Sequence, residues 1–377
     1  MLTLRRVLFR SLTLGVTVGA IAGCALVRSH PVLSHSAQMV KFIELPPLLI
    51  AQAMPDPLLF DTAADFAEGV AAVRIGDRLA YIDPTGTIRI TVMDENIDVV
   101  GEFADDRAVA RAGEYFGYID QTGHWAIDVQ FRQAKRFAEG LAAVQGGTRY
   151  GFINRQGNWV IEPEFELAES FSEGLAVVKQ EGRYGYLNPQ GEMTIPLQFR
   201  DAWSFSEARA VVKIDNKQGY IDPTGAIAIP LTFDGAFSFA GGLARVRQGS
   251  QWGFINPQGD FQIDPRFDYA SDFSEGLAAV LEGSQWRYIN PAGEVVITGA
   301  FSYVGDFSEG LAAVQVDGQY GYINPAGELA IAPQFQNAGP FANGLARVQI
   351  ENRWGFINPN GQLLSGEGDR QPRPKAR

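Results

Sequence analysis

Two stretches of the chain are nearly identical: FSEGLAAVLEGSQWRYINPAGEVVI at residues 273–297 and FSEGLAAVQVDGQYGYINPAGELAI at residues 307–331. Their first residues are 34 positions apart. A fixed period of this length is the signature of a tandem repeat, in which one small unit is stacked many times. The fold of the chain is therefore predicted from the fold of this unit.

The leading Phe of the unit recurs at the same interval along most of the chain. It is found at Phe103, Phe137, Phe171, Phe205, Phe239, Phe273, Phe307 and Phe341. A further copy begins at Phe66, 37 residues before Phe103. The sequence thus predicts nine units, of which the first is modified, as terminal units of repeat arrays usually are.

Each unit contains only short apolar runs separated by Gly and Pro, which favours strands over helices. Residues 277–280 (LAAV) and 320–324 (YGYIN) are typical of such strands. The INPAG segment at 323–327 predicts a tight turn, because Asn opens it, Pro fixes φ and Gly accepts a positive φ. We therefore expect three short antiparallel strands in each unit.

Length and number of units bear on how the units are arranged. A unit of 34 residues is shorter than the usual propeller blade of about 40 to 45 residues, and nine blades exceed the typical four to eight. We therefore predict an all-β fold in which nine three-stranded meanders form an open, twisted array over residues 57–364. The alternative is a closed, propeller-like ring. PLLF at 57–60 would permit closure, because it supplies a Pro-x-x-Phe element that is missing after Leu364.

The step from an aromatic residue to Gly identifies a resemblance. It appears as YGFIN, YGYLN, WGFIN, YGYIN and WGFIN, beginning at residues 150, 184, 252, 320 and 354. With the Pro-Gly turn and the Ile-x-Pro-x-Phe segment that follow, this pattern resembles the WG-repeat family of bacterial proteins. The resemblance implies an all-β repeat protein without known catalytic residues. Three units depart from it, at Leu79-Ala80, Gln218 and Trp286-Arg287, and we expect packing to differ there.

The beginning of the chain predicts export. Arg5, Arg6 and Arg10 precede an apolar run at 12–22, as in a secretory signal peptide comprising residues 1–23. The run ends in Ile-Ala-Gly-Cys, which resembles the lipobox of bacterial lipoproteins and implies lipidation of Cys24, the single cysteine. The alternatives are cleavage after Ala22, giving a soluble periplasmic or secreted protein, and an uncleaved anchor.

Two further segments flank the repeats. Residues 24–56 are predicted to be a tether that carries the lipidation site, and residues 365–377 to be a disordered tail. The chain carries a formal net charge of −12, and removal of residues 1–23 leaves 28 basic against 43 acidic side chains. This balance argues against nucleic acid as a partner and against electrostatic docking on anionic lipid. Contact with a membrane is expected only through the lipid anchor.

Few residues are suited to catalysis. The three histidines are His30, His35 and His124, and the first two lie in the tether, so neither a His-based triad nor a His-rich metal site is expected. No cofactor is predicted. An acid recurs in the FxEG turn, and a row of equivalent acids lacks the two different environments that a glycosidase needs. We therefore predict a structural role for the row, which comprises Glu68, Asp105, Glu139, Glu173, Glu207, Glu275 and Glu309.

The tryptophans are the remaining functional candidates, since aromatic faces stack on sugars and anchor protein interfaces. Trp286 and Arg287 form the candidate binding site, because Arg stands where most units have Gly. The predicted function is a non-enzymatic, exported, lipid-anchored scaffold that binds a protein partner in the bacterial cell envelope. A carbohydrate- or peptidoglycan-binding module is the alternative, and a hydrolase using carboxylates is a weaker one.

Overall fold

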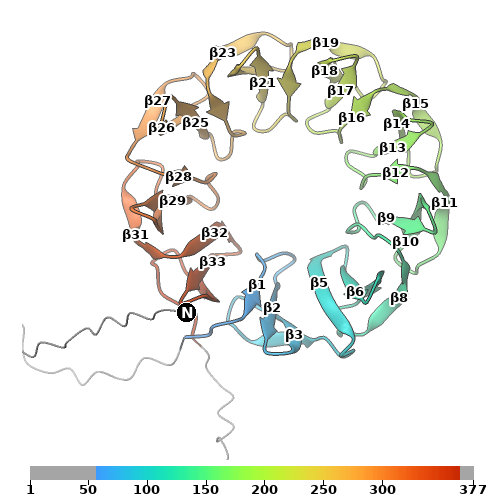
Figure 1. The fold of residues 1–377 in the computed structure, drawn as a ribbon, viewed down its shortest axis with the longest axis horizontal. Coiled ribbons are helices and arrows are strands. Elements are labelled where there is room, and N and C mark those ends of the chain that lie inside the picture. The colour runs from blue at the N-terminus through green and yellow to red at the C-terminus, as the bar shows by residue number, and fades with distance from the viewer. Residues whose placement is uncertain (1–56, 366–377) are drawn as a thin grey trace, which may run out of the picture. The chain divides into compact units, whose positions relative to one another are not determined.

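The structure, a computed structural model, describes residues 57–365. The predictions for the signal peptide, for Cys24, for the tether up to residue 56 and for the tail from residue 366 onward lie outside the described residues. Within residues 57–365 the regular elements are strands, and every strand pair is antiparallel between neighbours in sequence. The nine units form nine small sheets, here called blades 1 to 9, arranged in a ring (Figure 1).

The strands of each blade follow one another along the chain. Blades 1 to 3 comprise β1 (Thr62–Ala63), β2 (Ala71–Ile75), β3 (Arg78–Ile82) and β4 (Ile88–Thr91); β5 (Ile97–Ala104), β6 (Arg107–Ala112), β7 (Tyr115–Ile119) and β8 (Trp125–Phe131); and β9 (Leu141–Gly146), β10 (Arg149–Asn154) and β11 (Trp159–Phe165). Blades 4 to 6 comprise β12 (Leu167–Ala168), β13 (Ala176–Gln180), β14 (Arg183–Leu187) and β15 (Met193–Phe199); β16 (Asp201–Ala202), β17 (Ala210–Ile214), β18 (Lys217–Ile221) and β19 (Ile227–Phe233); and β20 (Gly235–Ala236), β21 (Ala244–Gln248), β22 (Gln251–Ile255) and β23 (Phe261–Phe267). Blades 7 to 9 comprise β24 (Tyr269–Ala270), β25 (Ala278–Glu282), β26 (Gln285–Ile289) and β27 (Val295–Thr298); β28 (Tyr303–Val304), β29 (Ala312–Val316), β30 (Gln319–Ile323) and β31 (Leu329–Phe335); and β32 (Asn337–Ala342), β33 (Leu345–Ile350) and β34 (Arg353–Ile357).

The all-β fold and the nine units are confirmed, whereas two details of the prediction are wrong. Seven of the nine sheets have four strands instead of three, because most units begin with an additional short strand, usually of two residues. The last strand of most blades runs along the outer rim of the ring (Figure 1). The open array is also wrong, since the alternative ring is what the structure contains.

The two ends of the repeat region close the ring by strand pairing. The amide of Phe60 donates to the carbonyl of Trp354 at 2.7 Å, and the amide of Trp354 donates to the carbonyl of Phe60 at 2.8 Å. The amide of Leu58 donates to the carbonyl of Leu364 at 3.0 Å. Trp354 is therefore paired with Phe60 as Tyr320 is paired with Phe335 inside blade 8. PLLF supplies the outer strand that blade 9 lacks.

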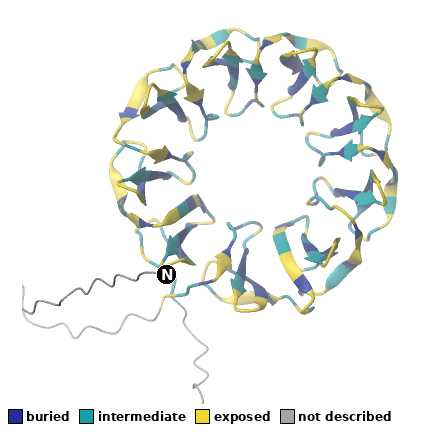
Figure 2. Ribbon diagram, viewed as in Figure 1, coloured by how far each residue is buried: buried dark blue, intermediate teal, exposed yellow. Residues whose placement is uncertain are grey.

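The core lies between blades and not inside them, and Figure 2 shows buried residues in the strands of every blade. Buried apolar residues form nine clusters, and each cluster joins two neighbouring blades. One of the nine joins Ala71 and Ile82 of blade 1 to Leu345 and Phe356 of blade 9. An open array of nine blades would have only eight such interfaces, so the count itself requires closure.

An aromatic pair recurs at every interface. Tyr220, fully buried in blade 5, packs against Phe239 of blade 6 with ring centroids 5.1 Å apart. Its hydroxyl donates to the carbonyl of Phe237 at 2.8 Å. The closing interface contains the same pair, Phe356 with Phe66 at 5.0 Å. The leading Phe of each unit is thus fixed by the preceding blade, which explains its strict spacing.

Glycine at the aromatic-Gly step allows the outer strand to come close. A Cβ on Gly253 would lie 2.5 Å from the carbonyl oxygen of Ile263 on the outer strand β23, which pairs there with a register shift. Ala80 and Arg287 replace this Gly in blades 1 and 7, and the outer strands β4 and β27 have only four residues instead of seven. Packing therefore differs at these two steps as expected. At the third step, Gln218 replaces the aromatic residue, and the outer strand β19 still has seven residues. The side-chain oxygen of Gln218 accepts a hydrogen bond from the amide of Ala236 at 2.6 Å.

Candidate functional site

A groove between blades 7 and 8 contains one of the residues predicted for binding. Trp286 lines it from β26, together with Tyr269 of β24 and Tyr303 of β28. Its volume is about 470 Å³. Tyr269 and Tyr303 are 43% and 44% exposed, so two aromatic rings of the groove are accessible to a ligand. The rings of Tyr269 and Trp286 meet edge to face at a centroid distance of 5.7 Å.

Polar groups lie beside the aromatic rings. Asp306 lines the groove from blade 8 and Ser271 from blade 7. Burial raises the pKa of the Tyr303 hydroxyl, and the nearby carboxylate of Asp306 raises it further. The groove therefore combines phenol rings with an acidic side chain, a combination suited to a cation or to a hydroxyl-rich ligand.

Arg287, the other predicted residue, does not line this groove. Its guanidinium lies 3.3 Å from a carboxylate oxygen of Glu282 on the neighbouring strand and donates to the side chain of Gln285 at 3.0 Å. The structure therefore separates the two adjacent candidates. Sequence reasoning missed Tyr269, Tyr303 and Asp306. A comparison of units could have found the two tyrosines, since Tyr occupies the second position after the Phe of the outer strand only at the start of blades 7 and 8.

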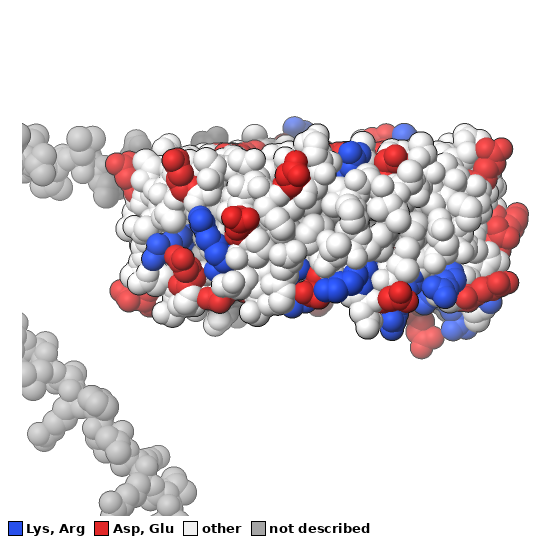
Figure 3. All heavy atoms as spheres, turned by 90° about the horizontal axis from the view of Figure 1, so that it is seen from above, with Lys and Arg blue, Asp and Glu red and all other residues white. Residues whose placement is uncertain are grey.

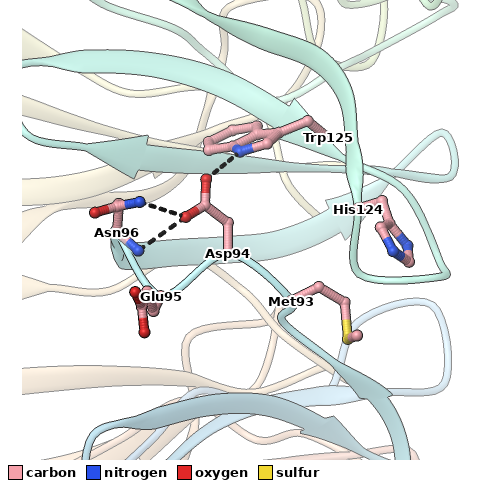
Figure 4. Close-up of a pocket in the computed structure, with 6 residues that line it drawn as sticks. All are labelled: Met93, Asp94, Glu95, Asn96, His124 and Trp125. Carbon is pink, nitrogen blue, oxygen red and sulfur yellow. Dashed lines mark hydrogen bonds between the residues drawn. The ribbon is translucent and has the colours of Figure 1, made fainter.

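A second hollow, of about 460 Å³, lies where the first two repeats are three residues further apart than the rest (Figure 4). It is lined by Met93, Asp94, Glu95, Asn96, His124 and Trp125. The indole N–H of Trp125 donates to Asp94 at 2.8 Å, and the amide of Asn96 donates to the other carboxylate oxygen at 2.9 Å. The Trp125 bond is the main cause that lowers the pKa of Asp94. Because this carboxylate already accepts these hydrogen bonds, we infer that it stabilises the irregular segment at residues 93–96.

The row of acids in the FxEG turns joins neighbouring blades. The Glu173 carboxylate accepts the amides of Glu207 at 2.7 Å and Ala208 at 2.9 Å, both in the next turn. Equivalent bonds run from Glu68, Asp105, Glu139, Glu207, Glu275 and Glu309 to the turns that follow them. Glu173 itself has a φ of +54°, a left-handed conformation that is unfavourable for residues other than Gly. The bonds to the next blade account for Glu at this position and support the predicted structural role.

The Asx turns are likewise satisfied locally. The side chain of Asn324 accepts the amides of Ala326 and Glu328, each at 3.0 Å. Among residues 57–365, no group of three or more His, Cys, Asp or Glu side chains is placed to hold a metal ion. No helix in the same range could cross a membrane.

Charges on the ring are mixed in sign. Figure 3 shows Lys and Arg interspersed with Asp and Glu on one side of the molecule, between wide areas of uncharged side chains. Cation–π contacts are concentrated in blades 6 and 7, where Arg245 lies 3.7 Å from the ring centroid of Phe237. Exposed aromatic residues and cation–π contacts therefore differ from one interface to another.

Comparison with known proteins identifies the repeat. The WG containing repeat matches residues 57–78, 116–145, 150–184, 184–217, 219–252, 252–286, 286–320 and 320–354. No curated protein sequence matches the chain at a significant level.

The chain is similar to solved structures at low sequence identity. A eukaryotic initiation factor is similar with a TM-score of 0.55 at 11% identity, over 73% of this chain and 86% of that chain. Hsv2 of Kluyveromyces lactis has a TM-score of 0.35 at 10% identity, over 81% and 98% of the two chains. The likeness to the initiation factor concerns the fold alone. Repeat propellers commonly serve as platforms for protein interaction. The family matches cover most of the sequence, and this chain belongs to the WG containing repeat family.

Proposed function

We propose that this protein is a non-enzymatic scaffold that binds a protein partner in the bacterial cell envelope, to which an N-terminal lipid on Cys24 anchors it. The observation that carries the proposal is that one set of residues in each unit joins the blades, while another set varies on the surface. The aromatic pairs and the FxEG carboxylates connect one blade to the next, while exposed groove residues such as Tyr269 and Tyr303 differ from their equivalents in other blades. Variation on a constant frame is what a binding surface requires.

The acids of the turns and of the irregular segment already bind structural partners. Glu173 and its equivalents accept backbone amides of the next turn, and Asp94 accepts an indole N–H and an amide. The groove between blades 7 and 8 is lined by a single carboxylate, that of Asp306. A glycosidase would need a second carboxyl group across the sugar bond. We therefore propose binding without turnover.

A carbohydrate is the second candidate ligand, and the aromatic groove favours it. Tyr269, Trp286 and Tyr303 offer ring faces and edges beside one acid, and sugars stack on such rings while their hydroxyls bond to the polar groups. A hollow of about 470 Å³ is large enough for a small ligand. This alternative predicts retention on purified cell-wall glycan without a protein.

A crosslinked pull-down with the full-length protein from envelope extracts, run beside purified cell-wall glycan, tests both candidates. A specific, near-stoichiometric protein is expected. Retention on glycan with no protein partner would replace the scaffold by a sugar-binding module. The anchor is tested separately with Cys24→Ser, which should abolish incorporation of labelled fatty acid and release the protein from membranes. Unchanged labelling would refute lipidation at this residue.

A further inference from the structure

The interface between blades 6 and 7 holds an arginine in a defined set of contacts. The Nε of Arg245 donates to a carboxylate oxygen of Asp272 at 2.7 Å, and Nη1 donates to the carbonyl of Ala270 at 2.7 Å. The guanidinium lies 3.7 Å from the ring centroid of Phe237 and 5.8 Å from that of Trp252. A carboxylate, a backbone carbonyl and aromatic rings thus bind one guanidinium group in the space between two blades.

The closing interface repeats this arrangement. Arg347 of blade 9 occupies the same place in its unit as Arg245, and its Nε lies 2.8 Å from a carboxylate oxygen of Asp65 in blade 1. Its Nη1 donates to the carbonyl of Ala63 at 3.1 Å, and the guanidinium lies 5.2 Å from the centroid of Trp354. In both cases the carbonyl belongs to the residue two positions before the acid. The arrangement is therefore a property of the repeat and not of one blade.

The groove between blades 7 and 8 has the tryptophan, the carbonyl and the acid of this arrangement without the arginine. It also lacks the phenyl ring, as does the closing interface, where Gly339 stands at the position of Phe237. Trp286 corresponds to Trp252, Val304 to the residue that supplies the carbonyl, and Asp306 to the acid. Ala279 stands at the position of Arg245, and it lines the groove. The groove of about 470 Å³ therefore lies in the space that Arg245 fills between blades 6 and 7 and that Arg347 fills between blades 9 and 1.

Neighbouring residues keep this groove open. Ser271 and Gly305 line it, and both are small. At the same position of the unit, blade 5 has Trp203 and blade 6 has Phe237. Among residues 57–365 the Asp306 carboxylate has no ion-pair partner, whereas the equivalent Asp272 is paired with Arg245. Blade 7 therefore supplies no cation to the carboxylate of Asp306, because Ala279 stands at the position of the arginine.

We propose that the groove between blades 7 and 8 binds the guanidinium group of an arginine side chain on a partner protein. The inference deepens the scaffold function and rests on it. Arginine fits better than lysine, because its planar group donates to a carboxylate and a carbonyl at once while it lies beside a tryptophan ring, as Arg245 does. The net charge of −12 favours the approach of a basic partner.

Calorimetric titration of the full-length protein with the capped tripeptide acetyl-Gly-Arg-Gly-amide tests the proposal. Peptides with Lys or citrulline in place of Arg, and free L-arginine, are titrated in parallel. The Arg peptide should bind more tightly than the Lys peptide, and the citrulline peptide should not bind measurably. Asp306→Asn should weaken the Arg peptide about tenfold or more, because it removes a charge-assisted hydrogen bond. Asp260→Asn, an exposed substitution of equal charge on blade 6, should change nothing.

Ala279→Arg is the more specific variant, since blades 6 and 9 show that an arginine is accommodated at this position. The new side chain should pair with Asp306 and abolish peptide binding while the thermal unfolding temperature is kept or raised. Equal binding of the Arg and citrulline peptides, or full binding by either groove variant, would overturn the proposal. If free L-arginine binds as tightly as the peptide, the guanidinium group need not come from a protein, and that part of the proposal would be overturned.

The pull-down separates this proposal from the function on which it rests. A partner captured by the wild type and by Asp260→Asn, but not by Ala279→Arg, supports both. A partner still captured by Ala279→Arg leaves the scaffold in place and overturns the groove as its anchor. Glycan that binds the wild type but not Ala279→Arg would assign the groove to sugar instead.

Discussion

Replacing Phe60 by Ala should loosen both ends of the repeat region, because this side chain closes the ring. Phe60 is 1% exposed, and its ring lies 6.1 Å from that of Phe356 in the cluster that joins blades 1 and 9. Deleting a buried Phe side chain costs about 3–5 kcal/mol. In an open array the same residue would lie at a free end, and the substitution would cost little.

The assay is amide hydrogen exchange followed by mass spectrometry. The amide of Trp354 donates to the carbonyl of Phe60 and reports directly on closure. A loss of about 3 kcal/mol in local stability corresponds to about 100-fold faster exchange or more. Phe335→Ala is the matched control, because Phe335 pairs with Tyr320 at the same position of an internal blade and is 3% exposed.

In the closed ring, both substitutions should accelerate exchange in their own blades to a similar extent. Unchanged exchange at Trp354 in Phe60→Ala, together with faster exchange around Tyr320 in Phe335→Ala, would refute closure by this strand. The comparison does not depend on the absolute cost of a Phe to Ala change, since the two sites have the same pairing and nearly the same burial.

Three further substitutions test the packing of the unit. Gly253→Ala should destabilise the fold by about 1–3 kcal/mol in thermal or urea unfolding, because the new Cβ would lie 2.5 Å from a backbone oxygen; a neutral effect would contradict the close approach. Tyr220→Phe should cost about 1 kcal/mol, since the part-buried hydrogen bond to the carbonyl of Phe237 is lost, and an unchanged unfolding temperature would argue against that bond. Hydrogen bonds, chiefly from Trp125, lower the pKa of Asp94 in the folded state, so its contribution is present above the unfolded pKa of about 4 and is lost as the pH falls through the lower, folded value. Asp94→Asn should therefore flatten the loss of stability below about pH 4, and an unchanged pH profile would contradict this.

The sequence predicted the unit well because each of its signals is local. The Asn324 turn, the leading Phe and the apolar strand runs are determined within one repeat or between two neighbours. The extra first strand escaped prediction because it is usually two residues long, too short to show a period.

Closure could not be settled by the same signals. The overlap at residues 57–60 was visible, yet simple phasing of nine whole units explained it equally well. The ring follows from pairing between residues nearly 300 positions apart, Phe60 and Trp354, which no periodic pattern encodes. The usual blade length favoured an open array, but the short strands and tight turns of this repeat make a smaller blade.

The candidate site was predicted in part. Trp286 was singled out by its departure from the motif, and it does line a groove, whereas Arg287 is paired with Glu282 on its own sheet. The more informative difference was the Ala at position 279, because it removes a side chain that two other blades use to fill the same space. The small side chain of Ala279 could be interpreted only after the contacts of the equivalent residues Arg245 and Arg347 were known.

The closed ring is the claim on which the interfaces and the groove depend, and an engineered disulfide tests it most directly. Pro57 and Ser365 are antiparallel bridge partners, so their Cα atoms are expected about 4.5–5.5 Å apart, within disulfide range. Pro57→Cys with Ser365→Cys in a Cys24→Ser background should oxidise within one chain and migrate faster on a non-reducing gel. The pair Asp260→Cys with Ser365→Cys should not. Crosslinks only between chains, or none, would show that the ends do not meet and would contradict the ring.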